Sequence, residues 1–464
     1  MKTIKYIYSK ITLFLVLILL VTTGCERELS DDVVEATFSS TAEIFTDTPV
    51  GMGTDFYFPY IGEPSNPLGS KLTAWSIDTD ISYQGSASMR FDVPNAADPE
   101  GNFAGALFKI DGAGRNLTKY NVLTFWARAS QGCSIAEIGF GEGDFATKLE
   151  NVNLSTQWTK YFIPIPDPSK FLQERGMLFY SAGSINGFGY TFWIDELKFE
   201  SISTLGVAVP YIQNGNNENS SVFVGDNSLS ISGIGATYKL PNGFDQKVNI
   251  NSSFFDFNSS DASVAATTGS NISIVGSGAA VLTGSLNGKD AAGSLNISSV
   301  DLAPTPTLPQ ANVISIFSDA YTNNPVDYFN GYWGFSTTQG QDDIDVNGNK
   351  MIKYTELNFV GTEFQGTPID ISSMTHFHID ILVDEPIDSG DFIRIQLDNL
   401  AGRKGAFTIN LNSTPALKNG GWISLDLPFS SFGLNPNTTD LKQLVYVSDA
   451  TVKTIYVDNI YFHN

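Results

Sequence analysis

The stretch that decides the fold class lies at Tyr190–Phe199 and reads YTFWIDELKF. Bulky apolar and polar residues alternate along it, which is the period of a strand with one buried face. Near the C-terminus, Lys453–Phe462 reads KTIYVDNIYF and has its aspartate in the corresponding place. Each stretch follows, across a loop, a strand pattern with tryptophan near its start, at Gln157–Ile165 (QWTKYFIPI) and Gly421–Leu427 (GWISLDL). Strand, loop and strand at these intervals predict two antiparallel sandwiches that are distant copies of one another.

Composition also favours strands over helices. The 464 residues include 33 Phe, 18 Tyr and 42 Gly, which suit strands joined by tight turns. Alternating runs such as FIRIQL at Phe392–Leu397 are easy to find, whereas long amphipathic helical patterns are not. We therefore expect an all-β protein.

Changes in composition divide the chain into segments. The region after residue 202 is poor in aromatic residues and rich in Ser, Asn, Gly and Ala, and residues 301–310 (DLAPTPTLPQ) contain three prolines that predict a stiff linker. The predicted segments are a signal peptide at 1–24, a tether at 25–40, a first module at 41–202, a spacer at 203–300, the linker at 301–310 and a third module at 311–464.

The N-terminus has the pattern of a secretory signal peptide. Three lysines accompany an apolar run of about 11 residues, Ile11–Val21, which is too short to span a bilayer. Thr22, Thr23 and Gly24 then lead directly to Cys25, which resembles the lipobox of bacterial lipoproteins, with Thr22 in place of the usual leucine. The resemblance implies that Cys25 is lipidated and becomes the new N-terminus. The acidic run ERELSDD that follows resembles the signal that sends Bacteroidetes lipoproteins to the outer face of the outer membrane, or is simply an acidic tether.

Charge and cysteine content exclude several classes of protein. The net charge of −23 repels nucleic acids and polyanionic glycans, so that a ligand should be neutral or cationic. Cys133 is the only cysteine besides Cys25, which leaves no partner for an internal disulfide, and a buried, inert thiol is expected. With only three histidines in the chain, no zinc-like Cys/His grouping is present.

The closing-strand pattern resembles jelly-roll carbohydrate-binding modules, including families 4 and 11. The third module, with FSDAYTN at Phe317–Asn323, YWGFS at Tyr332–Ser336 and MTHFHID at Met374–Asp380, is similar to C-terminal modules of laminarinase-type glycanases. The middle region, with SNISIVGSGAAVL at Ser270–Leu282, resembles a bacterial immunoglobulin-like spacer. These resemblances imply two jelly-roll β-sandwich modules flanking an immunoglobulin-like β-sandwich.

The whole arrangement is similar to surface glycan-binding lipoproteins of Bacteroidetes Sus-like polysaccharide utilisation systems. It implies non-catalytic binding of a neutral polysaccharide at the outer-membrane surface, with a β-glucan such as laminarin as the expected ligand and a Sus-like transporter pair as a further partner.

A neutral sugar offers apolar C–H faces that stack on flat aromatic rings and hydroxyls that need polar partners. Trp75 and Trp333 lie in polar or glycine-bounded stretches, where rings have fewer packing partners and are better candidates for stacking; the alternative is that they cap the core from a loop. The sequence does not decide whether Trp126 faces the core or the solvent. Trp158, Trp193 and Trp422 are expected in the core. The predicted glycan-binding residues are Tyr57, Trp75, Arg90, Trp126, Tyr332, Trp333 and Arg394.

In jelly-roll modules of the resembled kind, the aspartate of the last strand often ligates a structural calcium ion. The resemblance therefore implies calcium at Asp195 in the first module and at Asp458, with Asp319, in the third. Glu43 or Asp47 would assist Asp195. The alternative is that these carboxylates make hydrogen bonds in turns. No other cofactor is expected.

An enzyme remains the alternative function. The Glu-x-Asp-x-x-Glu signature of family 16 glycanases is absent, and so are G-x-S-x-G, H-E-x-x-H and a P-loop. A glycoside hydrolase or lyase with an unfamiliar pair of carboxylates on a jelly roll stays possible, because acids are abundant. A second alternative is an adhesin or structural surface protein.

Overall fold

The computed structural model describes residues 37–341, 344–402, 404–433 and 439–464. The predicted signal peptide, Cys25 and most of the predicted tether lie outside the described residues. Within these ranges no helix is long and apolar enough to cross a membrane. The only helical elements there are 3-10 turns: η1 (Gly143–Phe145), η2 (Pro168–Lys170), η3 (Gln213–Gly215), η4 (Ser252–Phe254), η5 (Gln310–Asn312) and η6 (Phe429–Phe432). The all-β prediction is confirmed.

The first sandwich has a small and a large sheet. In the small sheet the order is β3-β4-β11-β6-β9, and β1 pairs with the far end of β11. Phe91 of β4 and Phe192 of β11 stack inside the sandwich with ring centroids 4.6 Å apart. The strands are β1 (Glu43–Phe45), β3 (Trp75–Asp78), β4 (Ser88–Val93), β6 (Val122–Ala129), β9 (Thr159–Pro164) and β11 (Tyr190–Glu200).

The large sheet has eight strands in the order β12-β14-β15-β8-β7-β10-β5-β2. Its strands are β2 (Tyr57–Pro59), β5 (Phe103–Lys109), β7 (Cys133–Phe140), β8 (Thr147–Leu154), β10 (Gly176–Gly183), β12 (Val209–Tyr211), β14 (Gly235–Lys239) and β15 (Asp245–Ile250). Because β15 pairs with β8, the sheet of the first sandwich continues into the segment predicted as the spacer.

The remaining strands of the spacer form a five-stranded and a two-stranded sheet. In the larger one the order is β13-β21-β19-β16, β20 pairs with β19, and β13 runs parallel to β21. The strands are β13 (Asn217–Phe223), β16 (Phe255–Ser259), β17 (Ala265–Thr268), β18 (Asn271–Ile274), β19 (Gly278–Leu286), β20 (Lys289–Asp290) and β21 (Ser294–Val300). The buried residues of this part join the core of the first sandwich in one cluster.

The third sandwich repeats the strand order of the first. One sheet runs β23-β24-β31-β26-β29 with β22 paired to β31, and the other runs β25-β30-β27-β28. The first of these sheets corresponds strand for strand to β3-β4-β11-β6-β9 with β1, and the second corresponds to β5-β10-β7-β8. The prediction that the two sandwiches are copies of one fold is therefore confirmed. The strands are β22 (Val313–Phe317), β23 (Ile344–Val346), β24 (Asn349–Tyr354), β25 (Phe359–Glu363), β26 (His376–Val383), β27 (Phe392–Asn399), β28 (Lys404–Asn410), β29 (Ile423–Pro428), β30 (Leu441–Val447) and β31 (Ile455–His463).

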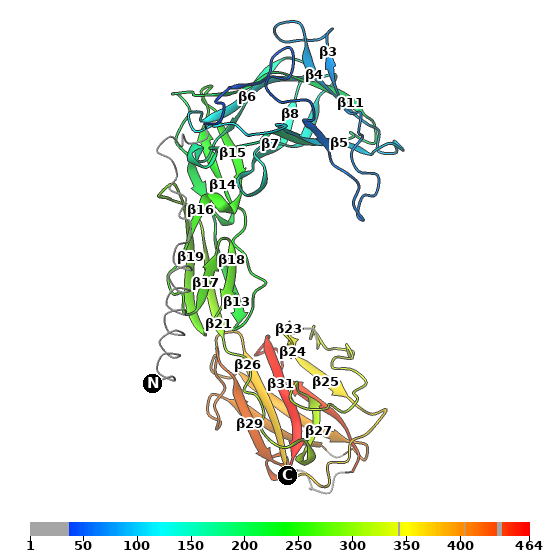
Figure 1. Cartoon of the computed structure of the whole chain (residues 1–464). Coiled ribbons are helices and arrows are strands. Elements are labelled where there is room, and N and C mark those ends of the chain that lie inside the picture. The colour runs from blue at the N-terminus through cyan, green and yellow to red at the C-terminus, as the bar shows by residue number, and fades with distance from the viewer. Residues whose placement is uncertain (1–36, 342–343, 403, 434–438) are drawn as a thin grey trace, which may run out of the picture.

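The three parts follow one another along an elongated molecule, and the first sandwich projects sideways from its end of the spacer (Figure 1). At the other end, Phe223 of β13 packs into a small apolar cluster with Met351, Leu382 and Tyr456 of the third sandwich. The molecule therefore holds two copies of one sandwich apart on a shared spacer.

Candidate functional site

The outer face of the large sheet in the first sandwich carries three aromatic rings, Tyr60, Phe103 and Phe179, which we name the aromatic platform. Phe103 and Phe179 occupy outward positions of β5 and β10, where the alternate residues, such as Ala104, face the core. Tyr60 follows β2, and its N–H donates to the Gly105 carbonyl oxygen at 3.1 Å. The side chain of Tyr60 is 38% exposed, and those of Phe103 and Phe179 are half-buried.

Two glycines allow these rings to lie on the sheet. A Cβ atom added to Gly105 would be 2.7 Å from Cε2 of Phe103 and 3.0 Å from Cδ2 of Tyr60. A Cβ atom added to Gly139 of β7 would be 2.5 Å from Cζ of Phe179. Any other residue at these positions would clash with the rings, and at Gly139 also with the Thr147 carbonyl oxygen, because such approaches are closer than van der Waals contact. The glycines therefore let each ring lie over the backbone of the sheet.

A group of charged side chains adjoins the platform. Lys148 of β8 is the register partner of Gly139, and its Nζ lies 2.6 Å from Glu137 and 3.0 Å from Glu150. The hydrogen bond from Lys148 holds the pKa of Glu150 below its usual value, so this carboxylate is charged at neutral pH. Burial and the nearby Glu137 raise the pKa of Tyr60 to about 12, so its hydroxyl stays protonated and can donate or accept.

This surface has the two kinds of groups that a neutral sugar needs. The rings offer flat apolar faces, and the carboxylates, the ammonium group and the phenol offer acceptors and donors for hydroxyls. Apart from Tyr60, which directly follows β2 and is bonded to Gly105, the group lies on strands of one sheet, so its geometry is fixed by backbone hydrogen bonds.

The prediction that Trp75 and Tyr57 are exposed rings is wrong. Trp75 begins β3 opposite the buried Phe91 and faces the interior of the sandwich. Its ring centroid lies 5.5 Å from those of Phe56 and Phe108 and 5.4 Å from that of Tyr57. The indole Nε1 is buried without a hydrogen-bond partner among the described residues, and the Tyr57 hydroxyl lies against the buried Tyr180. Both rings close one edge of the core. The prediction failed because the polar residues around Trp75 belong to the start of a strand and not to a loop.

Arg90 and Trp126 lie on the outer face of the small sheet, away from the aromatic platform. Arg90 forms ion pairs with Asp92 at 3.0 Å and with Asp78 at 3.4 Å. The Trp126 ring is covered by Tyr83, which stacks on it with centroids 3.9 Å apart and an angle of 13°. Both side chains therefore already have partners within the protein, and the structure does not bring them to the platform.

In the third sandwich, Trp333 lies on the equivalent sheet face. A Cβ atom added to Gly361 would be 2.5 Å from Cζ2 of Trp333, so the indole lies over β25 as the platform rings lie over β5. Gly361 and Gly105 are each the third residue of matching strands. The Trp333 Nε1 donates to the Tyr328 hydroxyl at 2.9 Å. The neighbouring Tyr332 is 56% exposed on the same loop.

Polar side chains line the same face next to Trp333. Gln443 and Gln396 donate to Asp398 Oδ2 at 2.8 and 3.2 Å, and Glu363 pairs in register with Gln443. Within the described part of the chain, Glu363 Oε1, Asp398 Oδ1 and Arg394 Nε are buried without a hydrogen-bond partner. Burial raises the pKa of Glu363. Unpaired buried polar atoms are costly, so this face is prepared for an outside partner such as a sugar hydroxyl.

The aspartate of the first closing strand makes hydrogen bonds, as the alternative to calcium proposed. Asp195 lies two residues after Trp193 at a bulge of β11, where Glu196 has φ 50°. Its carboxylate accepts from the N–H groups of Tyr83 at 2.7 Å, Gln84 at 3.1 Å and Glu196 at 2.7 Å. Asp47, which was expected to bind calcium together with Asp195, accepts a hydrogen bond from the Ala87 N–H at 2.9 Å. Both carboxylates thus hold the loop before β4, and calcium at Asp195 stays a prediction.

In the third sandwich the acids around the closing aspartate are closer together. Burial, and then the charges of Asp319 and Asp380, raise the pKa of Asp458 to about 7. Asp458 accepts from the Asn459 N–H at 2.6 Å, and Asp319 accepts from the Lys350 N–H. Among the described residues, no group of three or more His, Cys, Asp or Glu side chains is arranged to hold a metal. Calcium at Asp319 and Asp458 remains a prediction.

The raised pKa of Asp458 predicts a pH-dependent stability. The folded state binds the proton more tightly than the unfolded state, so the stabilisation is full below pH 4 and is lost as the pH rises towards and through 7. A pKa of about 7 in the folded state corresponds to a loss of at most ~4 kcal/mol. Asp458→Asn should flatten this loss, measured by thermal unfolding at pH 5 and pH 8 in EDTA. An unchanged pH profile would contradict the assignment, and stabilisation by calcium that disappears in the variant would support the metal site.

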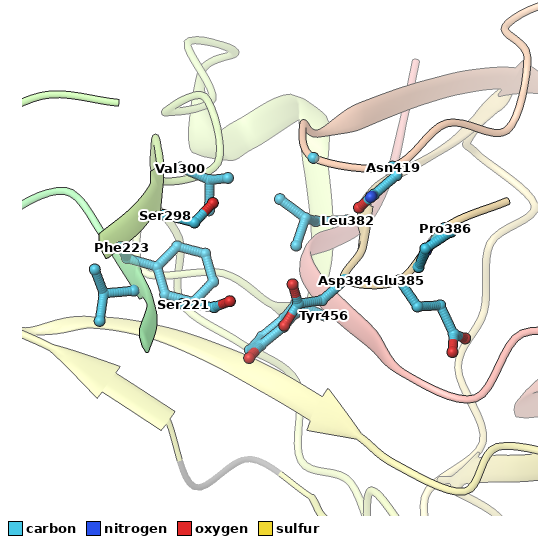
Figure 2. A pocket seen from close by; sticks show the side chains of 12 residues that line it. Ser221, Phe223, Ser298, Val300, Leu382, Asp384, Glu385, Pro386, Asn419 and Tyr456 are labelled. Carbon is cyan, nitrogen blue, oxygen red and sulfur yellow. The ribbon is translucent and has the colours of Figure 1, made fainter. Parts of the chain in front are cut away.

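A hollow of about 270 Å³ lies where the spacer meets the third sandwich (Figure 2). Phe223 and Tyr456 meet edge to face in its wall with centroids 5.0 Å apart, and Asp384 contributes to its lining. Trp422 packs at the same joint, where its Nε1 donates to the Asp301 carbonyl oxygen at 2.8 Å. The hollow belongs to a joint that fixes the third sandwich on the spacer.

Sequence reasoning missed the aromatic platform. Tyr60, Phe103 and Phe179 lie in ordinary strand patterns, whereas most of the predicted rings are tryptophans. One signal was present: glycines occur inside strand patterns at Gly105 and Gly139, where a strand-interior glycine marks a close approach.

The platform lies within a region that matches a known family. Residues 43–201, from β1 to the end of β11, match the model described as Carbohydrate binding domain 30. No curated protein matches the sequence. The first sandwich is therefore similar to a family of carbohydrate-binding domains, and the rest of the chain lies outside that match.

Solved structures of carbohydrate-binding modules are similar at low identity. A family 30 module is 18% identical, with 34% of this chain and 86% of that chain covered and a TM-score of 0.26. A family 11 module from Clostridium thermocellum, in complex with a β-1,3-1,4-mixed-linked tetrasaccharide, is 16% identical, with 28% and 85% covered and a TM-score of 0.21. The N-terminal CBM22 tandem domain from Paenibacillus barcinonensis is 11% identical, with 93% and 99% covered and a TM-score of 0.21.

Proposed function

We propose that this protein binds a neutral polysaccharide on the aromatic platform and does not cleave it. The observation that carries the proposal is the set of rings lying over Gly105 and Gly139 within the carbohydrate-binding domain. A sugar ring stacked there would have Glu137, Lys148 and Glu150 beside it to bond its hydroxyls.

The charge of the chain supports a neutral ligand. The net charge of −23 would repel an acidic polysaccharide, while a neutral glucan is indifferent to it. Our choice is a β-glucan such as laminarin. The charged residues next to the platform occur as ion pairs, which suits hydrogen bonding to hydroxyls better than capture of a charged group.

The proposed setting is the cell surface. A lipid on Cys25 would anchor the chain to the outer membrane, the acidic residues after it would direct it outward, and the bound glycan would pass to a Sus-like transporter pair. The elongated arrangement supports this role, because the spacer separates the two sandwiches (Figure 1). Two sites on one molecule would raise the avidity for a long chain through effective concentration.

The test is a binding panel with the whole protein. Laminarin, mixed-linkage β-glucan, xylan and an acidic polysaccharide are compared in affinity gels and by titration calorimetry, and reducing sugars are measured in parallel. We expect retardation by at least one neutral glucan, none by the acidic polymer and no release of reducing ends. Failure of every neutral glycan to bind would contradict the proposal. Oligosaccharide release that a single carboxylate substitution abolishes would show an enzyme instead.

The third sandwich should provide a second site. Trp333→Ala removes the ring over Gly361, and the polar row at Asp398 alone should not retain a sugar. In calorimetry with a short oligosaccharide, we expect the number of sites per chain to fall from about two to about one. The reciprocal variant, Phe179→Ala, should weaken the other site and leave this one unchanged. An unchanged number of sites in Trp333→Ala would show that the third sandwich does not bind.

A further inference from the structure

We propose that the spacer forms part of the binding surface, because its strands β12, β14 and β15 extend the platform sheet and add a further ring, Tyr211, for a longer glycan. This inference rests on the proposed function and deepens it. The matched carbohydrate-binding domain ends at residue 201, so these three strands lie beyond it.

The extension is a continuous row of register partners. One row of outward positions crosses all eight strands of the large sheet, in the order Tyr211, Gly235, Asn249, Lys148, Gly139, Phe179, Leu107 and Phe58. The alternate residues in the spacer strands, such as Ala236 and Val248, are buried in the core. The row therefore places the spacer residues on the same outer face as Phe179.

Tyr211 repeats the ring-over-glycine arrangement of the platform. A Cβ atom added to Gly235 of β14 would be 2.6 Å from Cζ of Tyr211, so this ring too lies over a strand where a side chain is missing. The side chain of Tyr211 is half-buried, and Lys247 lies 5.9 Å from its ring centroid. Three strands of this sheet thus carry a glycine with an aromatic ring over it, at Gly105, Gly139 and Gly235.

Polar groups connect Tyr211 to the platform. Glu150, already paired with Lys148, also interacts with Asn249 of β15. Burial and the charge of Glu150 raise the pKa of Tyr211, so its hydroxyl remains a donor at neutral pH. A ligand leaving the Phe179 ring would therefore meet hydrogen-bonding side chains before it reached Tyr211.

The length of the row determines what it can bind. Neighbouring strands lie ~4.8 Å apart, so the five steps from Phe179 to Tyr211 cover about 24 Å. The sheet also twists by roughly 20–25° at each step, so a ligand would follow a curved path. A short oligosaccharide would occupy the Phe179 end alone, and only a longer one would reach Tyr211.

The test uses the dependence of affinity on ligand length. Tyr211→Ala is made in the full chain that carries Trp333→Ala, so that the third sandwich does not contribute. Titration calorimetry compares a laminarin-type disaccharide with a long oligosaccharide of the same linkage. We expect Tyr211→Ala to weaken the long ligand about tenfold and to leave the short one unchanged. Tyr211→Phe, which keeps the ring, should retain most of the affinity.

Controls separate this inference from the proposed function. Phe244→Ala removes a 72% exposed ring at the turn between β14 and β15, outside the row, and should change neither affinity. Phe179→Ala should weaken both ligands. If Phe179→Ala weakens binding but Tyr211→Ala leaves the long ligand unaffected, the spacer does not take part and the proposed function stands. If Tyr211→Ala weakens both ligands equally and lowers the melting temperature, its effect is structural and the inference fails.

Discussion

Phe179→Ala should lower the affinity of the first sandwich for a soluble β-glucan about 30-fold, or about 2 kcal/mol. Phe179 of β10 lies over Gly139, between the two rings at Gly105 and the charged side chains of β8, and the substitution removes its whole stacking face. Truncating a central, well-packed aromatic residue costs more than truncating one at the rim. The measurement is calorimetry with a short oligosaccharide in the Trp333→Ala protein.

The matched control is Trp126→Ala in the same protein. Trp126 belongs to the same sandwich but lies on the outer face of the opposite sheet under Tyr83. We expect its removal to leave the affinity unchanged even where it lowers the melting temperature. Loss of binding in Trp126→Ala, with Phe179→Ala unaffected, would move the binding face to the small sheet and refute the platform.

Asp195→Ala should lower the free energy of unfolding of the first sandwich by about 3 kcal/mol. The substitution leaves the N–H groups of Tyr83, Gln84 and Glu196 without their acceptor in a buried place. The loop that carries Tyr83 would also lose its attachment to β11. Urea unfolding followed by tryptophan fluorescence reports on this sandwich, because four of the six tryptophans lie in it.

Asp195→Asn provides the control, since its amide oxygen can still accept some of these hydrogen bonds and should cost less. EDTA should leave the unfolding curve of the unsubstituted first sandwich unchanged. If EDTA destabilises the sandwich as much as Asp195→Ala does, the carboxylate holds a cation and the hydrogen-bond assignment is wrong.

The fold could be read from the sequence because strand alternation is local. The patterns at Tyr190–Phe199 and Lys453–Phe462 became β11 and β31, which occupy the same place in two sheets of matching strand order. Their aspartates fall at matching bulges, followed by Glu196 and Asn459 with φ near 50°. A period of two in the chain fixes one face of a strand in the core, whatever its partners are.

The candidate site was predicted only in part. Trp333 and Arg394 lie on the outer face of the third sandwich's four-stranded sheet, as a glycan site there requires. Trp75 and Tyr57 turned out to pack inside the first sandwich. Local sequence shows that a ring lies in a polar stretch, but the side of the strand to which the ring points depends on register with a neighbour distant in the chain.

The sequence by itself determined that this protein is all-β, that two of its parts are copies and that they are joined through a region poor in aromatic residues. Only the tertiary structure decided where a ligand can lie. Gly105, Gly139, Phe179 and Tyr211 come from four separate strands and Tyr60 directly follows a fifth. Tyr211 joins the others because β12, β14 and β15 continue the sheet of the first sandwich. The physical reason is that alternation is encoded residue by residue, whereas a binding surface forms across strands, through pairings between residues more than 100 positions apart.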